Sequence, residues 1–170
     1  MLFRSVFKIS RDVQGARLTW LKVTGGALRV KAPLTYRAQN QDYNEKADQL
    51  RLYSGVKFCA LEEAGAGSVV AVTGLSHSYV GLGLGAEAEA SAPLLQPVLT
   101  YQLILPDGAD AHSALIKLRE LEEEDPMLRI VWDERYGQIH VQLMGKIQLE
   151  ILRRRIIDRF GLDVTLPNID

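Results

Sequence analysis

The amino-acid sequence predicts two domains, an all-β barrel followed by an α+β domain with the ferredoxin-like βαββαβ order. Three observations predict this division. Roughly the first 90 residues alternate apolar and polar side chains with the period of two that is typical of strands. Apolar residues at helical spacing occur only later in the chain. Pro93 and Pro97 separate the two patterns, so we expect a barrel domain over residues 1–92 and a ferredoxin-like domain over residues 97–170.

Short strands separated by turn residues fill the first domain. Gly25 and Gly26 predict a hairpin that pairs the strands on either side, and Pro33 is expected to end the second of these strands. The polar residues 38–44 are expected to form a loop, and residues 81–92 show no strong periodicity. Many short strands favour a closed barrel, because closure removes exposed sheet edges. The expected strands are 6–9, 18–23, 27–30, 49–53, 56–61 and 68–73.

The second domain begins with a strand over residues 98–105, rich in β-branched and aromatic side chains. A helix follows, with Ala111, Ala114, Leu115, Leu118 and Leu121 at helical spacing, and Pro126 ends it. The next elements are a hairpin over 128–133 and 138–143, a helix that starts near Gly145 and is capped by Gly161, and a last strand over 162–166. The second helix carries an apolar stripe of Leu149, Leu152, Ile156 and Phe160.

Composition favours a folded protein in the cytoplasm. Apolar residues make up 47% of the chain and charged residues 24%, so a packed core is expected. No apolar run approaches the ~20 residues needed to cross a membrane, and no secretory signal is visible, so a membrane partner is not expected. The single cysteine, Cys59, lies in an apolar strand pattern and is expected to be a reduced thiol in the core.

Positive charge is concentrated at the start of the chain. Residues 1–37 contain eight Lys and Arg side chains against one acid, Asp12, although the whole chain has a formal net charge of −1. A positive potential of this kind suits a phosphate backbone, but exposed strand faces also carry Lys and Arg without any such role. The candidates for RNA contact are Arg17, Lys22, Arg29 and Lys31.

The sequence shows little catalytic chemistry. The three histidines, at positions 77, 112 and 140, lack the spacing of a metal site, so neither a metal nor a catalytic residue is expected. His77 is flanked by Ser76 and Ser78, but no acid completes a triad. Four consecutive acids at 122–125 cannot share one helix face and are expected to be a solvated helix end.

Two apolar residues of the second helix, Ile147 and Ile151, lie roughly opposite the apolar stripe. Scattered exposed apolar side chains are normal in proteins, so these two can be incidental. The alternative is that they are domain-interface residues, which contact a neighbouring domain or a partner.

Several segments resemble the translational GTPase family, in the order in which that family has them. Residues 122–126, Glu-Glu-Glu-Asp-Pro, and residues 144–150, Met-Gly-Lys-Ile-Gln-Leu-Glu, resemble signatures of the third domain of elongation factor G. Residues 6–9, Val-Phe-Lys-Ile, and residues 15–23 resemble the second domain, a β-barrel. With Lys146 and Gln148, this pattern resembles the tetracycline-resistance ribosomal protection proteins more than it resembles elongation factor G.

The resemblance implies a fragment of a ribosome-associated GTPase, in which GTP and magnesium belong to a preceding domain that is absent here. The chain itself is therefore not expected to be an enzyme or to hold a cofactor. The resemblance also implies partners: small-subunit ribosomal RNA and the GTPase domain for the barrel, and a small-subunit ribosomal protein for the third domain. Two alternatives stay open, a freestanding RNA-binding module and an enzyme whose site is not recognisable from these motifs.

Overall fold

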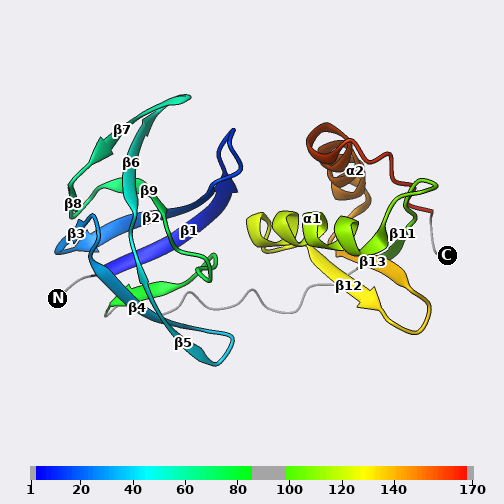
Figure 1. Ribbon diagram of the computed structural model, residues 1–170, viewed down its shortest axis with the longest axis horizontal. Coiled ribbons are helices and arrows are strands. Elements are labelled where there is room, and N and C mark those ends of the chain that lie inside the picture. Colours follow the sequence, from blue (N-terminus) through cyan, green and yellow to red (C-terminus); the bar gives the residue numbers. More distant parts are fainter. Residues whose placement is uncertain (1–2, 86–98, 168–170) are drawn as a thin grey trace. The chain divides into compact units, whose positions relative to one another are not determined.

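The computed structural model describes residues 3–85 and 99–167, and the chain divides into two compact units, Met1–Ala92 and Pro93–Asp170 (Figure 1). Each unit has its own cluster of buried apolar side chains. The described part of the first unit consists of strands and turns, and we call it the β-rich unit. The second combines strands with two helices, and we call it the α+β unit.

A six-stranded antiparallel sheet, ordered β10-β1-β2-β9-β6-β7, is the main part of the β-rich unit. Leu21 and Val23 on one strand and Val70 and Val72 on another occupy alternate positions and are fully buried in a shared core. The strands of this sheet are β1 (Phe3–Arg11), β2 (Arg17–Gly25), β6 (Gln49–Ser54), β7 (Lys57–Leu61), β9 (Val69–Thr73) and β10 (Gly83–Gly85). Two further ladders pair β3 (Ala27–Arg29) with β8 (Glu63–Gly65) and β4 (Pro33–Ala38) with β5 (Gln41–Lys46).

The predicted hairpin at Gly25 and Gly26 is wrong. β3 pairs with β8, with Leu28 opposite Ala64, and not with β2. β2 has no free edge for β3, because β1 pairs along one side of it and β9 along the other. Gly26 has a φ of 70°, a conformation that glycine adopts without strain, and here the chain leaves the six-stranded sheet.

Residues 38–44, predicted as a loop, contain a hairpin turn and most of a strand. β4 and β5 pair in register along their whole length. The strand before Pro33 has ended at Arg29, as predicted, but Pro33 is itself the first residue of a strand that was not predicted. The turn residues Gln39 and Asn40 have φ angles of 50° and 62°, which match the favoured two-residue hairpin geometry. The composition of β5 did not indicate a strand, because most of its side chains are exposed and polar. The segment 81–92 also contains a strand, β10, which pairs with β1.

Cys59 is exposed, so the prediction of a core thiol is wrong. In the described part of the chain β7 pairs only with β6, which leaves β7 at the edge of the sheet. Its first four residues are all exposed. An apolar run at a sheet edge has the same sequence pattern as one in the sheet interior, and the neighbouring strands decide which it becomes.

The α+β unit packs two helices on one face of a three-stranded antiparallel sheet ordered β11-β13-β12 (Figure 1). The predicted helical stripes are confirmed, since Leu118 and Leu121 of the first helix and Leu152 and Ile156 of the second are buried. The elements are β11 (Leu99–Leu103), α1 (Ala111–Glu124), β12 (Arg129–Asp133), β13 (Gln138–Leu143) and α2 (Lys146–Phe160).

The helix ends follow the residues that the sequence provides. The Asp110 carboxylate accepts a hydrogen bond of 2.8 Å from the Ser113 backbone N–H and caps the start of α1. Gly161, at φ 66°, ends α2 in the left-handed conformation and donates its N–H to the Ile157 carbonyl at 2.9 Å.

The last predicted strand is reduced to one bridge, between Ile104 and Thr165. These two residues exchange backbone hydrogen bonds of 2.8 and 2.9 Å. The next hydrogen-bonded pairs of an antiparallel ladder lie two residues away on either side, where Pro106 and Pro167 stand. Neither proline has an N–H to donate, so the ladder does not extend.

Candidate functional site

The side chain of Arg17, the first RNA-contact candidate, forms hydrogen bonds within the β-rich unit. Its guanidinium donates to the Leu75 carbonyl and to Ser78 Oγ, both at 2.7 Å. Ser78 Oγ also lies 2.7 Å from Thr19 Oγ1, and both of these side chains are buried. Arg17 therefore holds the loop after β9 against β2.

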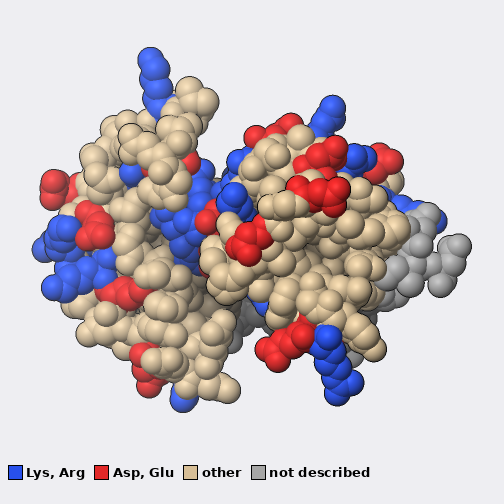
Figure 2. All heavy atoms as spheres, turned by 45° about the vertical axis from the view of Figure 1, so that its right-hand side comes forward, with Lys and Arg blue, Asp and Glu red and all other residues tan. Residues whose placement is uncertain are grey.

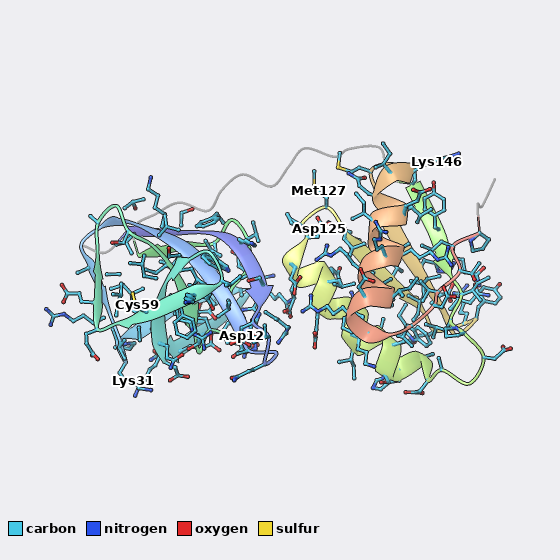
Figure 3. All side chains as sticks on the ribbon, turned by 90° about the horizontal axis from the view of Figure 1, so that it is seen from above. Asp12, Lys31, Cys59, Asp125, Met127 and Lys146 are labelled. Atoms are coloured by element: carbon cyan, nitrogen blue, oxygen red, sulfur yellow. The ribbon has the colours of Figure 1, made fainter. Side chains whose placement is uncertain are left out.

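Arg29 and Lys31 lie on the surface, each in an ion pair with an acid from a later segment. Arg29 Nε is 2.5 Å from Glu63 Oε2, and Lys31 Nζ is 2.9 Å from Asp48 Oδ1. Figure 3 labels Lys31 at the periphery of the unit. Exposed pairs of this kind contribute only about 0–1 kcal/mol, so a competing phosphate can displace either acid at low cost.

Lys22 is exposed on β2, and no described acidic side chain pairs with it. Lys8, on β1, is also exposed, with its ammonium 5.5 Å from the centre of the Trp20 ring. The strong positive charge that the sequence shows over residues 1–37 is thus partly neutralised in space, because strand pairing brings later acids beside Arg29 and Lys31. Figure 2 shows Asp and Glu interspersed among Lys and Arg on the visible surface of the molecule.

Several polar side chains of the β-rich unit converge on the Glu45 carboxylate. Ser76 donates to the Glu45 carboxylate through its backbone N–H at 3.0 Å and its hydroxyl at 2.6 Å. The Tyr36 hydroxyl donates to the same carboxylate, and His77 Nδ1 lies 3.1 Å from it. The Tyr43 ring stacks on His77 with centroids 3.8 Å apart. We call these five residues the Glu45 cluster.

Hydrogen bonding keeps Glu45 ionised. Burial alone would raise the pKa of its carboxyl, but hydrogen bonds from Ser76, Tyr36 and His77 outweigh burial and lower this pKa to about 2. Burial and the adjacent Glu45 charge raise the pKa of the Tyr36 hydroxyl. The tyrosine therefore stays a neutral donor to the carboxylate.

The Glu45 cluster supplies the acid that the sequence around His77 lacked, but not the arrangement of a catalytic triad. Ser76 and His77 both bond to the carboxylate, so no imidazole faces the serine hydroxyl as a general base. Sequence reasoning missed the cluster because Glu45 is 31 residues from Ser76 along the chain. The arrangement fastens the loop after β9 to the β4–β5 hairpin.

An ion pair between Arg51 and Asp12 connects a strand of the six-stranded sheet to a loop. The Arg51 guanidinium, nearly buried, lies 2.9 Å from the Asp12 carboxylate and donates to Tyr53 Oη at 3.2 Å. Asp12 also accepts backbone N–H groups from Gln14 and Ala16. The hydrogen bond from Arg51 lowers the pKa of the Asp12 carboxyl. The pair ties the β1–β2 loop to β6.

In the α+β unit, the acids at 122–125 are not all solvated, so that expectation is corrected. Glu124 lies between the two helices, 3.0 Å from Arg155 Nη2 and 2.7 Å from Arg159 Nη1. Its side chain is only 10% exposed. α1 ends where these two arginines of α2 approach it, and the contact joins the helices.

Ile147 and Ile151 are exposed, at 79% and 53%. Together with Ile157 they form an apolar ridge on α2, which lines a shallow hollow. The rest of the lining is charged: Glu150, Arg153, Arg154 and Asp158. Lys146 lies at the beginning of α2 (Figure 3).

Within residues 3–85 and 99–167, no group of three or more His, Cys, Asp or Glu side chains is placed to hold a metal ion. None of the helices there has the length and apolar character required to cross a membrane.

Residues 95–168 match the family model of elongation factor G, domain III. This range contains all the helices and strands of the described α+β unit. The match is therefore to the unit with two helices, and not to the β-rich unit.

Curated relatives match across both units. Elongation factor G 2 of Syntrophus aciditrophicus is 33% identical over 91% of this chain, and elongation factor G 2 of Geobacter metallireducens is 33% identical over 93%. The tetracycline resistance protein TetP of Clostridium perfringens is 25% identical over 97% of this chain. The chain spans 22%, 23% and 25% of these three relatives.

A crystal structure of a protein from Thermus thermophilus is similar to this chain, with a TM-score of 0.74 and 26% identity. It covers 98% of this chain, and the chain covers 25% of it. The chain as a whole is similar to a segment of the elongation factor G-like translational GTPases, and its second unit matches domain III of elongation factor G.

Proposed function

We propose that the chain is the barrel and ferredoxin-like segment, domains II and III, of a ribosome-associated GTPase. The observation that carries the proposal is the continuous match of both units, in order, to elongation factor G proteins over 91% to 94% of the chain. The bridge between Ile104 and Thr165 supports a ferredoxin-like domain, because it places the last segment beside β11. The role is to bind and position, in the cytoplasm, while GTP and magnesium are held by another domain of the parent protein.

The surface residues support a ribosome contact for each unit. Lys22, Arg29 and Lys31 are exposed on the β-rich unit and suit small-subunit RNA phosphates. The apolar ridge with Ile147 and Ile151 suits a protein neighbour, either another domain of the parent or a small-subunit ribosomal protein. Arg17 takes an internal role in this proposal, because its guanidinium is bonded to the loop after β9.

We also propose the tetracycline-resistance branch of the family. Its support is the Gly-Lys-Ile-Gln-Leu-Glu sequence of residues 145–150 and the match to TetP across both units. Expression of the parent protein in a tetracycline-sensitive bacterium tests this branch. Increased growth in the drug is expected, and growth equal to the vector control would assign the parent to the elongation branch.

Binding to isolated small ribosomal subunits tests the main proposal. We expect the 170-residue chain to co-sediment with the subunits and to dissociate as salt rises, because phosphate contacts release counterions. Isothermal calorimetry should detect no GTP binding by the chain alone. Absence of subunit binding at low salt would contradict the proposal, and equal binding to any RNA would favour a freestanding RNA-binding module.

A further inference from the structure

The outer face of the six-stranded sheet carries a row of aromatic rings beside basic side chains. We call it the aromatic face, and it consists of Phe7 and Lys8 on β1, Trp20 and Lys22 on β2, Tyr53 on β6 and Phe58 on β7. The ring centroids of Trp20 and Tyr53 are 5.1 Å apart, and those of Tyr53 and Phe58 are 5.2 Å apart. The intervening strand β9 contributes the small Ala71, opposite Trp20, so the rings meet across it.

A bulge in β1 places two successive side chains, Phe7 and Lys8, on this face. The register of β1 on β2 shifts between Val6 and Lys8, where Phe7 is the extra residue of a bulge. Val6 and Ile9 on either side of the bulge are buried, while Phe7 is 48% exposed and Lys8 is exposed. Phe58, at the other end of the row, is 46% exposed. Neither phenylalanine is needed by the core of the unit.

The charge on the aromatic face is positive. Lys8 and Lys22 are exposed cations, and Asp12, the acid that contacts Arg51 of this face, is bound to that arginine at 2.9 Å. Arg51 lies over the Phe58 ring at 4.3 Å, so the pair supports the rings and adds no net charge. Exposed rings flanked by exposed lysines match the chemistry of unpaired nucleotides, which present both π-faces and phosphates.

We propose that the aromatic face binds unpaired bases of single-stranded RNA, with Phe58 and its neighbouring rings stacking on the bases and Lys8 and Lys22 contacting phosphates. The proposal rests on the ribosome-contact role given above and makes it specific: the partner is an unpaired RNA segment, and the surface is this sheet face.

Fluorescence of Trp20 tests the proposal. In a Trp132→Phe chain, Trp20 is the only tryptophan, so its emission reports on the aromatic face. We expect an oligouridine ten-mer to quench this emission at low salt, and inorganic polyphosphate of similar charge to leave it unchanged. Equal quenching by both probes, or none by oligouridine, would overturn base stacking.

Variants of the rings and lysines locate the contact. Phe58→Ala should weaken oligouridine binding by about five-fold or more, the usual loss of one stacking ring, while Phe58→Tyr should restore it. The matched control is Leu52→Ala, a half-exposed side chain on the opposite face of β6. Lys22→Gln should lower the slope of log affinity against log salt by about 1. Equal affinities of Phe58→Ala and Leu52→Ala would reject the proposed face.

Binding to small subunits separates this proposal from the one on which it rests. If the unaltered chain binds subunits and Phe58→Ala binds equally well, the aromatic face is not the contact and only this inference fails. If Phe58→Ala loses subunit binding while oligouridine never quenches Trp20, the face binds a ribosomal protein and the RNA proposal fails. If the unaltered chain does not bind subunits, the proposed function itself fails.

Discussion

Gly74 shows how one residue without a side chain lets two segments pass close together. Its φ is 97°, and a Cβ atom built there would lie 2.5 Å from the Lys46 carbonyl oxygen and 2.8 Å from Asp48 Oδ2. A backbone atom from the end of β5 and a side-chain atom from the segment after it therefore occupy the space that any other residue would need. The glycine allows β9 to end beside the start of β6.

We expect Gly74→Ala to lower the free energy of unfolding of the β-rich unit by about 2 kcal/mol or more, because strained backbone and steric overlap add. The control is Gly15→Ala, at a φ of 84° but with no atom within 4 Å of the added Cβ. Urea titrations followed by Trp20 fluorescence measure both. Equal losses for the two variants would show that the overlap at Gly74 relaxes freely.

The Glu45 cluster predicts a dependence of stability on pH. The folded-state pKa of about 2 lies below the ordinary value of 4.5, so the charged carboxylate stabilises the fold above pH 4.5. That stabilisation is lost as pH falls from 4.5 toward 2. Because water partly screens the site, we expect it to be about 1–2 kcal/mol.

Glu45→Gln should remove this stabilisation at pH 7 and flatten the unfolding free energy between pH 4.5 and 2. Glutamine offers one acceptor oxygen with two lone pairs in place of two carboxylate oxygens, so it cannot satisfy all the donors from Tyr36, Ser76 and His77. Urea midpoints measured at intervals across this pH range provide the comparison. A variant that keeps the original pH profile would disprove the assignment to Glu45.

At the scale of elements, the sequence predicted those whose ends are marked by a proline or glycine next to a periodic apolar pattern. α1 and α2 were predictable because Pro126 and Gly161 follow apolar stripes at helical spacing. β8 and β10 have three residues each and exist only through their partners, so no local pattern defines them. For β3 the local pattern predicted the strand but not its partner, β8. Candidate sites follow the same rule. The exposure of Lys22 was predictable from the alternation of its strand, whereas the Glu45 cluster was not, because it joins residues that are remote in sequence.

The contact of Glu124 with Arg155 and Arg159 joins α1 to α2, and its loss should be costly. We expect Glu124→Gln to destabilise the α+β unit by about 2 kcal/mol, because two partly buried guanidinium groups lose their shared carboxylate. Asp163→Asn is the matched control, since Asp163 forms an exposed pair with Arg153 at 2.9 Å and should cost under about 1 kcal/mol. Thermal unfolding followed by Trp132 fluorescence measures both, and similar shifts in Tm would contradict the buried role.

At the scale of the whole molecule, two hydrophobic clusters with no shared residue divide the described chain. Each cluster belongs to one unit and each unit contains one tryptophan, Trp20 in the first and Trp132 in the second. We expect two unfolding transitions, because each cluster can open without exposing the other. Single-tryptophan variants should report different urea midpoints, and coincident midpoints with equal slopes would indicate one cooperative unit.

The single exposed thiol of Cys59 has a practical consequence for all of these experiments. Because the chain has no other cysteine, maleimide chemistry attaches a fluorophore or a photo-crosslinker at one defined position without any prior mutation. That position is on β7 next to Phe58, yet its side chain points to the other side of the strand. A crosslinker there can react with a molecule that binds next to the sheet, and mass spectrometry can then identify the crosslinked nucleotide or peptide.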